Sequence, residues 1–270
     1  MPELPEVETT CAGLRPRLIN LCLQKLIVRN PRLRWPVPAD LAGRLEGRTL
    51  VGLSRRGKYL LFDFDGATQI AHLGMSGSLR FAETGEPAGI HDHIDWIFEG
   101  DVTLRLRDPR RFGAVLWSAN PMQHPLLARL GPEPLTDAFD ANYLYAQCRT
   151  RSAAIKQIIM DGHVVVGVGN IYASESLFHA GIRPGTSARR LTRPACARLV
   201  AAIKRVLTAA IAAGGSSLRD YVQTSGELGY FQLHTQVYDR AGLACKRCNT
   251  PIRRIIQGQR ASFYCPQCQH

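Results

Sequence analysis

The chain has 270 residues, and its 34 Lys and Arg against 22 Asp and Glu give a formal net charge of +12. This length is enough for two domains, or for one domain with a small appendage. The charge indicates a polyanionic partner, since Lys and Arg contacts to phosphates supply most non-specific nucleic-acid affinity, although it would also suit a membrane surface or a ribosome. No apolar run is long enough to span a bilayer, and the acidic N-terminus lacks the basic and apolar segments of a secretory signal. We therefore expect neither a membrane-spanning nor a secreted protein.

A nucleophile can arise at the start of the chain, because removal of the initiator methionine before a small residue leaves Pro2 with a free secondary amine. The reference pKa of a terminal amine is about 7.7–8.0, so a useful fraction is unprotonated at neutral pH and can attack an electrophilic carbon to form an iminium. Glu3 and Glu6 lie close enough in sequence to move the protons of such a reaction. The alternative is structural, since acidic residues in a first helical turn favour the helix dipole, and we predict a helix over residues 3–12 that stops at Gly13. These residues taken alone favour the structural interpretation.

The next hundred residues predict an antiparallel sandwich or barrel, because short apolar runs alternate with turns over residues 18–117. The predicted strands are Leu23–Val28, Leu50–Leu53, Tyr59–Phe64, Gln69–Leu73, Ser78–Phe81, Ile94–Phe98, Val102–Leu106 and Ala114–Trp117. A proline-rich break at Gly131–Pro134 follows and predicts an interdomain hinge.

The period of the apolar residues becomes helical from Tyr143 onward. The predicted helices are Asp140–Cys148, Ala154–Asp161, Ile171–Ala180, Arg193–Ala213 and Ser217–Val222. The third of these helices follows Val166-Gly-Val-Gly-Asn170, and glycines before a helix N-terminus allow the backbone to approach a phosphate. The motif lacks the third glycine and the preceding strand of a dinucleotide fingerprint, and a plain tight turn between two helices is the alternative.

The last forty residues predict a structural zinc site. Cys245-Lys-Arg-Cys248 and Cys265-Pro-Gln-Cys268 are two CxxC pairs at zinc-ribbon spacing, which would close a tetrahedral four-thiolate site. A pair of redox CxxC motifs is the less favoured alternative. Two short strands, Ile252–Ile256 and Ala261–Tyr264, are predicted between the pairs, with Arg260 at the hairpin tip as a natural phosphate contact. The other four cysteines are scattered, which fits a reducing cytosol better than a disulfide scaffold.

Six segments of the chain together resemble the formamidopyrimidine-DNA glycosylase family, which comprises bifunctional glycosylase/AP lyases of base-excision repair. The resemblance runs in order from Pro2 to His270. Its segments are Pro2–Thr9, Arg56–Leu60, His72–Leu79, Asp108–Gly113, Gly167–Glu175 and the four-cysteine ribbon.

This resemblance implies an α+β multidomain fold with damaged duplex DNA bound between the domains. Its parts would be an N-terminal β-sandwich with an N-terminal helix, a helix–two-turn–helix domain and a C-terminal four-cysteine zinc ribbon holding one structural Zn²⁺ per subunit. The expected bounds are 1–131 for the catalytic domain, 132–138 for a hinge, 139–230 for the helix–two-turn–helix domain and 231–270 for the zinc finger.

The resemblance also implies the catalytic roles. Pro2 would be the Schiff-base nucleophile at C1′ and Glu3 the proton donor, with Glu6 supporting the N-terminus. Lys58 would donate a proton in β-elimination, and Arg260 would do so in δ-elimination besides contacting a phosphate.

The DNA contacts implied by the resemblance centre on a wedge that fills the gap left when the damaged nucleotide leaves the stack. Phe112 would insert beside the opposite base, Arg110 would pair with the orphaned cytosine, and Met75 would fill the void. Further DNA-binding positions are His72, His91, Arg111, Lys156, Asn170 and Arg260. A loop that encloses the base would include Ser217, Thr224, Ser225 and Tyr230. The HxH pattern of His91 and His93 resembles a metal-ligand pair, but the family has no metal there, and His93 is expected to be structural.

We therefore expect excision of oxidised purines, namely 8-oxoguanine and formamidopyrimidines, from duplex DNA, followed by β,δ-elimination at the abasic site. The alternatives are the endonuclease VIII branch, which prefers oxidised pyrimidines, and a zinc-ribbon DNA-binding protein without catalysis. The expected partner is damaged double-stranded DNA and not a membrane. We expect the protein to be a monomer in the bacterial cytoplasm that associates with the nucleoid through DNA.

Overall fold

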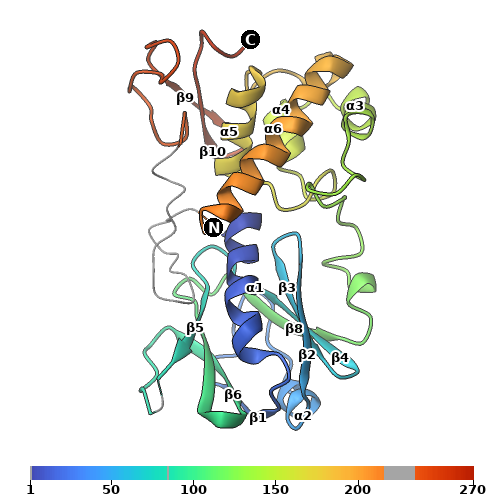
Figure 1. Ribbon diagram of the computed structural model, residues 1–270, viewed down its shortest axis with the longest axis vertical. Coiled ribbons are helices and arrows are strands. Elements are labelled where there is room, and N and C mark those ends of the chain that lie inside the picture. Colours follow the sequence, from blue (N-terminus) through green and yellow to red (C-terminus); the bar gives the residue numbers. More distant parts are fainter. Residues whose placement is uncertain (1, 84, 216–234) are drawn as a thin grey trace. The chain divides into compact units, whose positions relative to one another are not determined.

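The computed structural model describes residues 2–83, 85–215 and 235–270 (Figure 1). The described chain forms two compact units, residues 2–128 with 213–215 and residues 129–212 with 235–270. The finer expected division, with a hinge at 132–138, stays a prediction. Among the described residues, no helix combines the length and the hydropathy required to cross a membrane.

The N-terminal unit contains two four-stranded antiparallel sheets, as the alternating apolar runs predicted. One sheet has the order β1-β6-β7-β5 and the other the order β2-β3-β4-β8. Their strands are β1 (Leu23–Val28), β2 (Leu50–Arg56), β3 (Tyr59–Phe64), β4 (Ala67–His72), β5 (Ser78–Ala82), β6 (Asp92–Phe98), β7 (Val102–Arg107) and β8 (Ala114–Ser118). Each of the eight predicted strands is present, and its ends differ from the prediction by at most a few residues.

The two sheets of this unit share one hydrophobic core. Aromatic rings from β3 stack on rings from β6: Phe62 on Trp96 and Phe64 on Phe98, each pair with ring centroids 6.4 Å apart. The indole nitrogen of Trp96 donates to Gln69 Oε1 at 2.8 Å, which satisfies a polar group inside this core. The sandwich architecture is therefore confirmed.

The first helix, α1 (Leu4–Leu18), is longer than predicted, because it continues through Gly13 and Pro16. The stop at Gly13 was wrong because the buried stripe Leu4, Val7, Cys11, Leu14 and Leu18 recurs every three or four residues and packs into the core. Burial of this stripe outweighs the roughly 1 kcal/mol that an interior glycine costs. The short helix α2 (Leu41–Leu45) and the 3₁₀ turns η1 (Glu99–Asp101) and η2 (Pro121–Gln123) complete the unit.

The second unit is helical with a small β-hairpin. Its elements are α3 (Ala141–Arg149), α4 (Ile155–Ile159), α5 (Asn170–Ala180), the 3₁₀ turn η3 (Ala188–Arg190), α6 (Arg193–Ala212), β9 (Arg253–Gln257) and β10 (Arg260–Tyr264). The four predicted helices that fall on described residues are present. The fifth, at Ser217–Val222, lies outside the described residues. Helix α5 is buried on nearly all sides, and it packs on α6, α4 and β10.

The hairpin and its zinc knuckles pack onto α5 through a second hydrophobic cluster that includes Phe178, Ile252 and Phe263. The buried carboxylate of Glu175 on α5 accepts backbone N–H groups from residues 236, 237 and 238 at 2.8–3.0 Å. Burial raises the pKa of Glu175, while the three N–H bonds oppose that rise. This carboxylate fastens the start of the ribbon segment to the helix.

Candidate functional site

The start of α1 fixes the two acidic residues expected beside the nucleophile. Glu3 is the N-cap, and a reciprocal capping box links it to Glu6. The backbone N–H of Glu3 donates to Glu6 Oε2 at 2.8 Å, and both side chains are buried. A β-carbon at Gly215 would lie 3.2 Å from Glu6 Oε1, so the chain after α6 passes close to this carboxylate. These bonds fix the backbone at Glu3, directly after Pro2.

Lys58 lies in the turn between β2 and β3, directly before the first residue of β3. The turn is tied to α1, because Arg55 on β2 forms an ion pair with Glu8 at 2.8 Å and donates to the carbonyl of Gly57 at 3.0 Å. Arg15 of α1 adds a bond to the carbonyl of residue 53 at 2.7 Å. The helix that carries Glu3 and the turn that carries Lys58 therefore form one rigid piece.

His72 ends β4 as a neutral hydrogen-bond donor. Its Nδ1 accepts the backbone N–H of Gly74 at 3.0 Å, which leaves the proton on Nε2. Burial, together with the positive charges of Lys58 and Arg34, lowers the pKa of His72 to about 4. A neutral imidazole with an Nε2–H can donate to a phosphate oxygen without carrying a charge itself.

A cavity of about 250 Å³ lies beside His72 and Phe112, and its other lining residues are Arg34, Trp35, Tyr59, Ala114 and Leu126. Trp35 is 46% exposed. We made no prediction for Arg34 or Trp35 from the sequence, although an exposed Trp next to an Arg is a usual combination on nucleic-acid surfaces.

The three predicted wedge residues lie on two loops of the N-terminal unit. Met75 is 39% exposed on the β4–β5 loop, and Phe112 is 41% exposed on the β7–β8 loop. The Arg110 guanidinium lies 4.7 Å from the Phe112 ring centroid. The loops touch closely, since a β-carbon at Gly74 (φ +64°) would lie 2.4 Å from the Phe112 carbonyl carbon. Large apolar side chains exposed on touching loops suit insertion into a partner rather than a core.

Asp108, which the sequence did not single out, joins these loops and is fully buried. Its Oδ1 accepts the Ser76 hydroxyl at 2.8 Å, and its Oδ2 accepts the backbone N–H of Gly113 at 2.8 Å. Ser76 Oγ in turn accepts the backbone N–H of Arg110 at 3.2 Å. The imidazole of His93 bonds the Asp108 carbonyl oxygen at 2.8 Å, so His93 has a structural partner as expected. The sequence could not predict these hydrogen bonds of Asp108, because their partners come from three separate segments of the chain.

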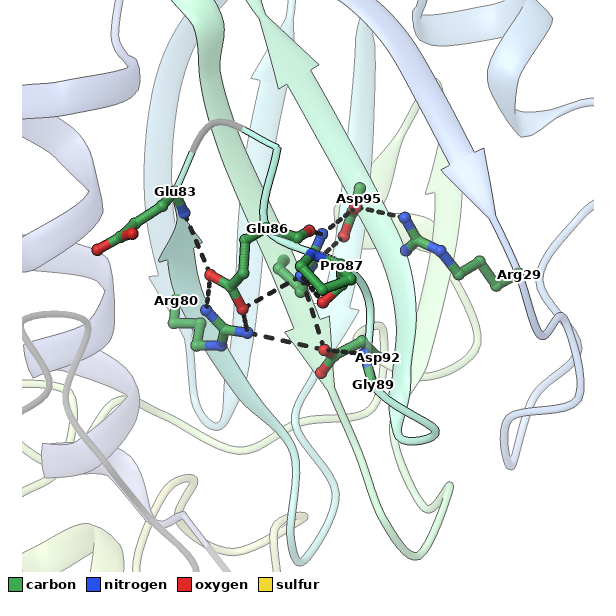
Figure 2. Close-up of polar contacts among 9 residues, drawn as sticks. Arg29, Arg80, Glu83, Glu86, Pro87, Gly89, Asp92 and Asp95 are labelled. Atoms are coloured by element: carbon green, nitrogen blue, oxygen red, sulfur yellow. Dashed lines mark hydrogen bonds and ion pairs between the residues drawn. The ribbon is translucent and has the colours of Figure 1, made fainter.

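His91 lies at the entrance to β6, where its carbonyl accepts the Asp108 backbone N–H at 3.0 Å. The preceding segment is anchored by the ionic network in Figure 2, in which Glu86 pairs with Arg80 and Asp92 caps the backbone N–H of Gly89 at 2.8 Å. The hydrogen bonds from Arg80 hold the pKa of Glu86 at about 2, so the pair stays ionised at neutral pH. This network places His91 next to the loop of Arg110, Arg111 and Phe112.

The second unit carries its own group of predicted DNA-binding residues. Lys156 is buried on α4, and its ammonium donates to Asn170 Oδ1 at 2.7 Å, Ser262 Oγ at 2.8 Å and the Ala261 carbonyl at 3.1 Å. Because the Asn170 oxygen is engaged, its amide N–H₂ is oriented as a donor at the start of α5. Arg260 begins β10 and shares a cavity of about 250 Å³ with Lys156. A helix N-terminus with an oriented amide and a guanidinium is suited to anions.

The four ribbon cysteines converge, and their Sγ atoms all lie within 4.8 Å of one another. The Cys248 sulfur lies 3.5 Å from that of Cys265, and the Cys245 sulfur lies 4.0 Å from that of Cys268. Zn–S bonds of about 2.3 Å in a tetrahedron place the sulfurs about 3.8 Å apart, so the set fits zinc with no open position. Asn249, which directly follows the first knuckle, has φ +61°. Zinc would here hold the hairpin and bring Arg260 to its tip.

The remaining site predictions fall outside the described residues. These are the base-enclosing positions Ser217, Thr224, Ser225 and Tyr230.

The fold and these residues define a DNA-binding enzyme with a structural zinc ribbon, and comparison with known proteins specifies which one. The chain matches the formamidopyrimidine-DNA glycosylase N-terminal domain over residues 1–115, the formamidopyrimidine-DNA glycosylase H2TH domain over 130–222 and a zinc finger found in FPG and IleRS over 242–270. The chain belongs to the formamidopyrimidine-DNA glycosylase family.

Relatives match over their whole length. The chain is 72% identical over 269 residues to a formamidopyrimidine-DNA glycosylase of Thiobacillus denitrificans, with 100% of both chains covered. Among solved structures it is similar to a Lactococcus lactis FPG mutant in complex with a Fapy-dG containing DNA, with 34% identity, 100% coverage of both chains and a TM-score of 0.93. It is also similar to the Lactococcus lactis Fpg bound to an abasic site containing DNA, with 33% identity, 99% coverage of both chains and a TM-score of 0.92.

Proposed function

We propose that this protein excises oxidised purines from duplex DNA and then cleaves the abasic site, with Pro2 as the nucleophile. The observation that carries the proposal is the capping box, which holds Glu3 and Glu6 around the backbone at Pro2 in a chain that matches the glycosylase family throughout. The relatives named above bind DNA with a formamidopyrimidine or an abasic site, which supports the same substrates here.

The first step is attack by the Pro2 nitrogen on C1′ of the damaged nucleotide. The N–C1′ bond forms as the glycosidic bond breaks, and the departing base takes up the proton that the proline nitrogen loses. Glu3 protonates the sugar ring oxygen, which opens the ring and gives an iminium between the proline nitrogen and C1′. The Glu6 carboxylate accepts the Glu3 backbone N–H, so we assign Glu6 the role of holding the N-terminal residues in place.

The iminium then acidifies the proton on C2′, and its removal expels the 3′ phosphate in β-elimination. A second elimination expels the 5′ phosphate, and water finally releases the sugar remnant from Pro2. We assign Lys58 and Arg260 to proton transfer in the first and the second elimination. The product is a one-nucleotide gap with phosphate at both ends.

The damaged nucleotide must leave the base stack before this chemistry, because the attacking amine cannot reach C1′ of a nucleotide that is stacked in the duplex. Unstacking costs a few kcal/mol, which the exposed side chains of Met75 and Phe112 offset by filling the gap. Arg110 would hydrogen-bond the orphaned cytosine. His72, His91, Arg111, Asn170 and Arg260 would contact the DNA backbone, with Lys156 orienting Asn170.

Borohydride trapping tests the mechanism. The protein, with and without a blocked N-terminus, is incubated with duplex DNA carrying one 8-oxoguanine opposite cytosine. We expect a covalent adduct that disappears when the terminus is blocked, since an amide nitrogen has no nucleophilic lone pair. An adduct with an oxidised pyrimidine and none with 8-oxoguanine would assign the endonuclease VIII specificity instead. Tight binding without an adduct on either lesion or on an abasic site would show a non-catalytic damage binder.

We further propose that the protein acts as a monomer in the bacterial cytoplasm and associates with the nucleoid through DNA. The positive net charge supports association with the chromosome. Sedimentation velocity of the protein with and without a lesion duplex tests the monomer, and a complex with two protein chains per duplex would contradict it.

A further inference from the structure

An arginine cluster lies in the second unit, away from the residues to which the glycosylase mechanism assigns a role. It comprises Arg149 and Arg151 at the end of α3, Arg189 and Arg190 in η3, and Arg193 at the start of α6. Four of the five are exposed, and Arg151 is half-buried.

Contacts between the two segments show that these arginines are neighbours. The backbone N–H of Arg189 donates to the Arg151 carbonyl at 3.1 Å, and the Arg149 guanidinium donates to the Arg189 carbonyl at 2.6 Å. The guanidinium groups of Arg149 and Arg193 lie 5.7 Å and 4.9 Å from the ring centroid of Tyr145. Stacking on one tyrosine holds both side chains in place without neutralising them.

Few acidic residues lie near these arginines in the sequence. The sequence has no Asp or Glu between Asp140 and Asp161, and none between Glu175 and Asp220. Within the described part of the chain, no arginine of the cluster forms an ion pair with a carboxylate. Arg193 begins α6, where the helix dipole adds positive potential, and Arg149 contacts the same tyrosine ring as Arg193. Such an arrangement raises the free energy of the folded protein unless an anion binds there.

The cluster is continuous with the proposed DNA-binding residues of the same unit. Residues 151–156 run antiparallel to residues 184–189, with backbone bonds from Ala188 to Ala153 and from Ile155 to Thr186. This short ladder leads from Arg151 to Lys156, which orients Asn170. Five residues span at most about 18 Å, so the Cα of Arg151 lies within about 18 Å of that of Lys156, a length that roughly five base pairs of duplex cover at about 3.4 Å each.

We propose, on the basis of the DNA-binding function proposed above, that the arginine cluster binds backbone phosphates of the duplex outside the lesion site. Guanidinium groups suit this role, because each presents several donors in a fixed fork that matches phosphate oxygens. The cluster thus lengthens the footprint of the enzyme on one side of the lesion. It contributes affinity that depends on salt and is independent of the lesion.

The test compares salt dependence on duplexes of two lengths. A short duplex ends about three base pairs from the lesion on both sides, and longer duplexes extend it by about twelve base pairs on one side or the other. The variant R189Q/R190Q/R193Q removes three exposed charges of the cluster. The matched control R17Q/R44Q/R48Q removes the same charge from the N-terminal unit, where each arginine also stacks on an aromatic ring or bonds a backbone carbonyl.

We compare plots of log affinity against log salt concentration for the cluster variant and the wild type. For the duplex extended on one particular side, the plot of the cluster variant should be shallower than that of the wild type. Each lost phosphate contact reduces the slope by about 0.9, so the expected reduction is about 2 to 3. On the short duplex the difference between the two slopes should be smaller. The charge-retaining variant R189K/R190K/R193K should restore most of the slope.

Three outcomes would overturn the proposal. The slope on both extended duplexes could match the wild type, the control variant could show the same reduction, or the cluster variant could lose binding to single-stranded RNA while its duplex slopes stay normal. The last result would assign the cluster to another polyanion. Failure of the glycosylase function is separate, since it would appear as absent excision by the wild-type protein whatever the salt slopes are.

Discussion

Replacing Asp108 with Asn tests whether one buried carboxylate positions the side chains that we assign to the wedge. The substitution keeps the volume and removes one of two acceptors. If the Asn oxygen accepts the Gly113 N–H, its N–H₂ group faces the Ser76 hydroxyl, which already accepts the Arg110 N–H. The hydroxyl proton then has no acceptor at a buried site. The opposite orientation places two donors against each other at Gly113.

The cost follows from this conflict. One buried donor without a partner costs about 1–3 kcal/mol, and the lost bond was to a charged acceptor, which favours the upper part of that range. The melting temperature should fall by about 2–4 °C for each kcal/mol. The loop can relieve the conflict by moving, and a shift of about 1 Å in a positioning element costs on the order of 100-fold in rate.

The assay is single-turnover excision of 8-oxoguanine opposite cytosine and opposite adenine, beside cleavage of a preformed abasic site in a single strand. We expect D108N to slow excision opposite cytosine by about 10- to 100-fold and to reduce the preference for cytosine, because Arg110 is no longer held. Cleavage of the single-stranded abasic site, which needs no wedge, should change by less than about 3-fold.

Gln69→Leu is the matched control, since it leaves the buried Trp96 N–H without its acceptor in the same unit but away from the loops. It should lower the melting temperature and keep the preference for cytosine. Equal losses in all three activities for D108N and Q69L would refute the positioning role and leave Asp108 as a stability residue only.

Three further predictions address zinc, pH and the catalytic turn. Chelation of zinc should abolish binding of lesion duplex and expose the ribbon to protease, because the four thiolates are the only cross-link of the ribbon among the described residues. Added zinc should reverse both effects. The pKa of His72 is about 4 in the folded protein and 6.5 in the unfolded chain, so its contribution to stability is complete above pH 6.5 and is lost as pH falls toward 4. The free energies of unfolding of wild type and H72Q, measured by denaturant titration, should therefore converge as pH falls over this range. E8Q should release the Arg55 anchor of the turn that carries Lys58 and slow abasic-site cleavage by about 3- to 10-fold, measured as single-turnover rates, and an unchanged rate would show that the turn holds its position without this ion pair.

The sequence determined the local elements and the chemistry that depends on residue type. Alternating apolar runs gave all eight strands of the sandwich, because the period of a half-buried strand is local. The spacing of the ribbon cysteines predicted the four-sulfur site, because two CxxC knuckles at this separation supply the four thiolates of a closed tetrahedral zinc site. The resemblance assigned Pro2 and the wedge residues, which their own patterns would have assigned to a helix cap and a core.

Only the tertiary structure decided which distant residues act together. Helix α1 continues past Gly13 because its buried stripe meets a core built from both sheets, and no local rule contains that burial energy. Asp108 became visible as the link between the wedge loops only when three segments were brought together. The arginine cluster likewise arises from two stretches about forty residues apart that pair through backbone bonds. Propensity and spacing act over a few residues, whereas hydrogen-bond partners and electrostatic neighbours are set by packing.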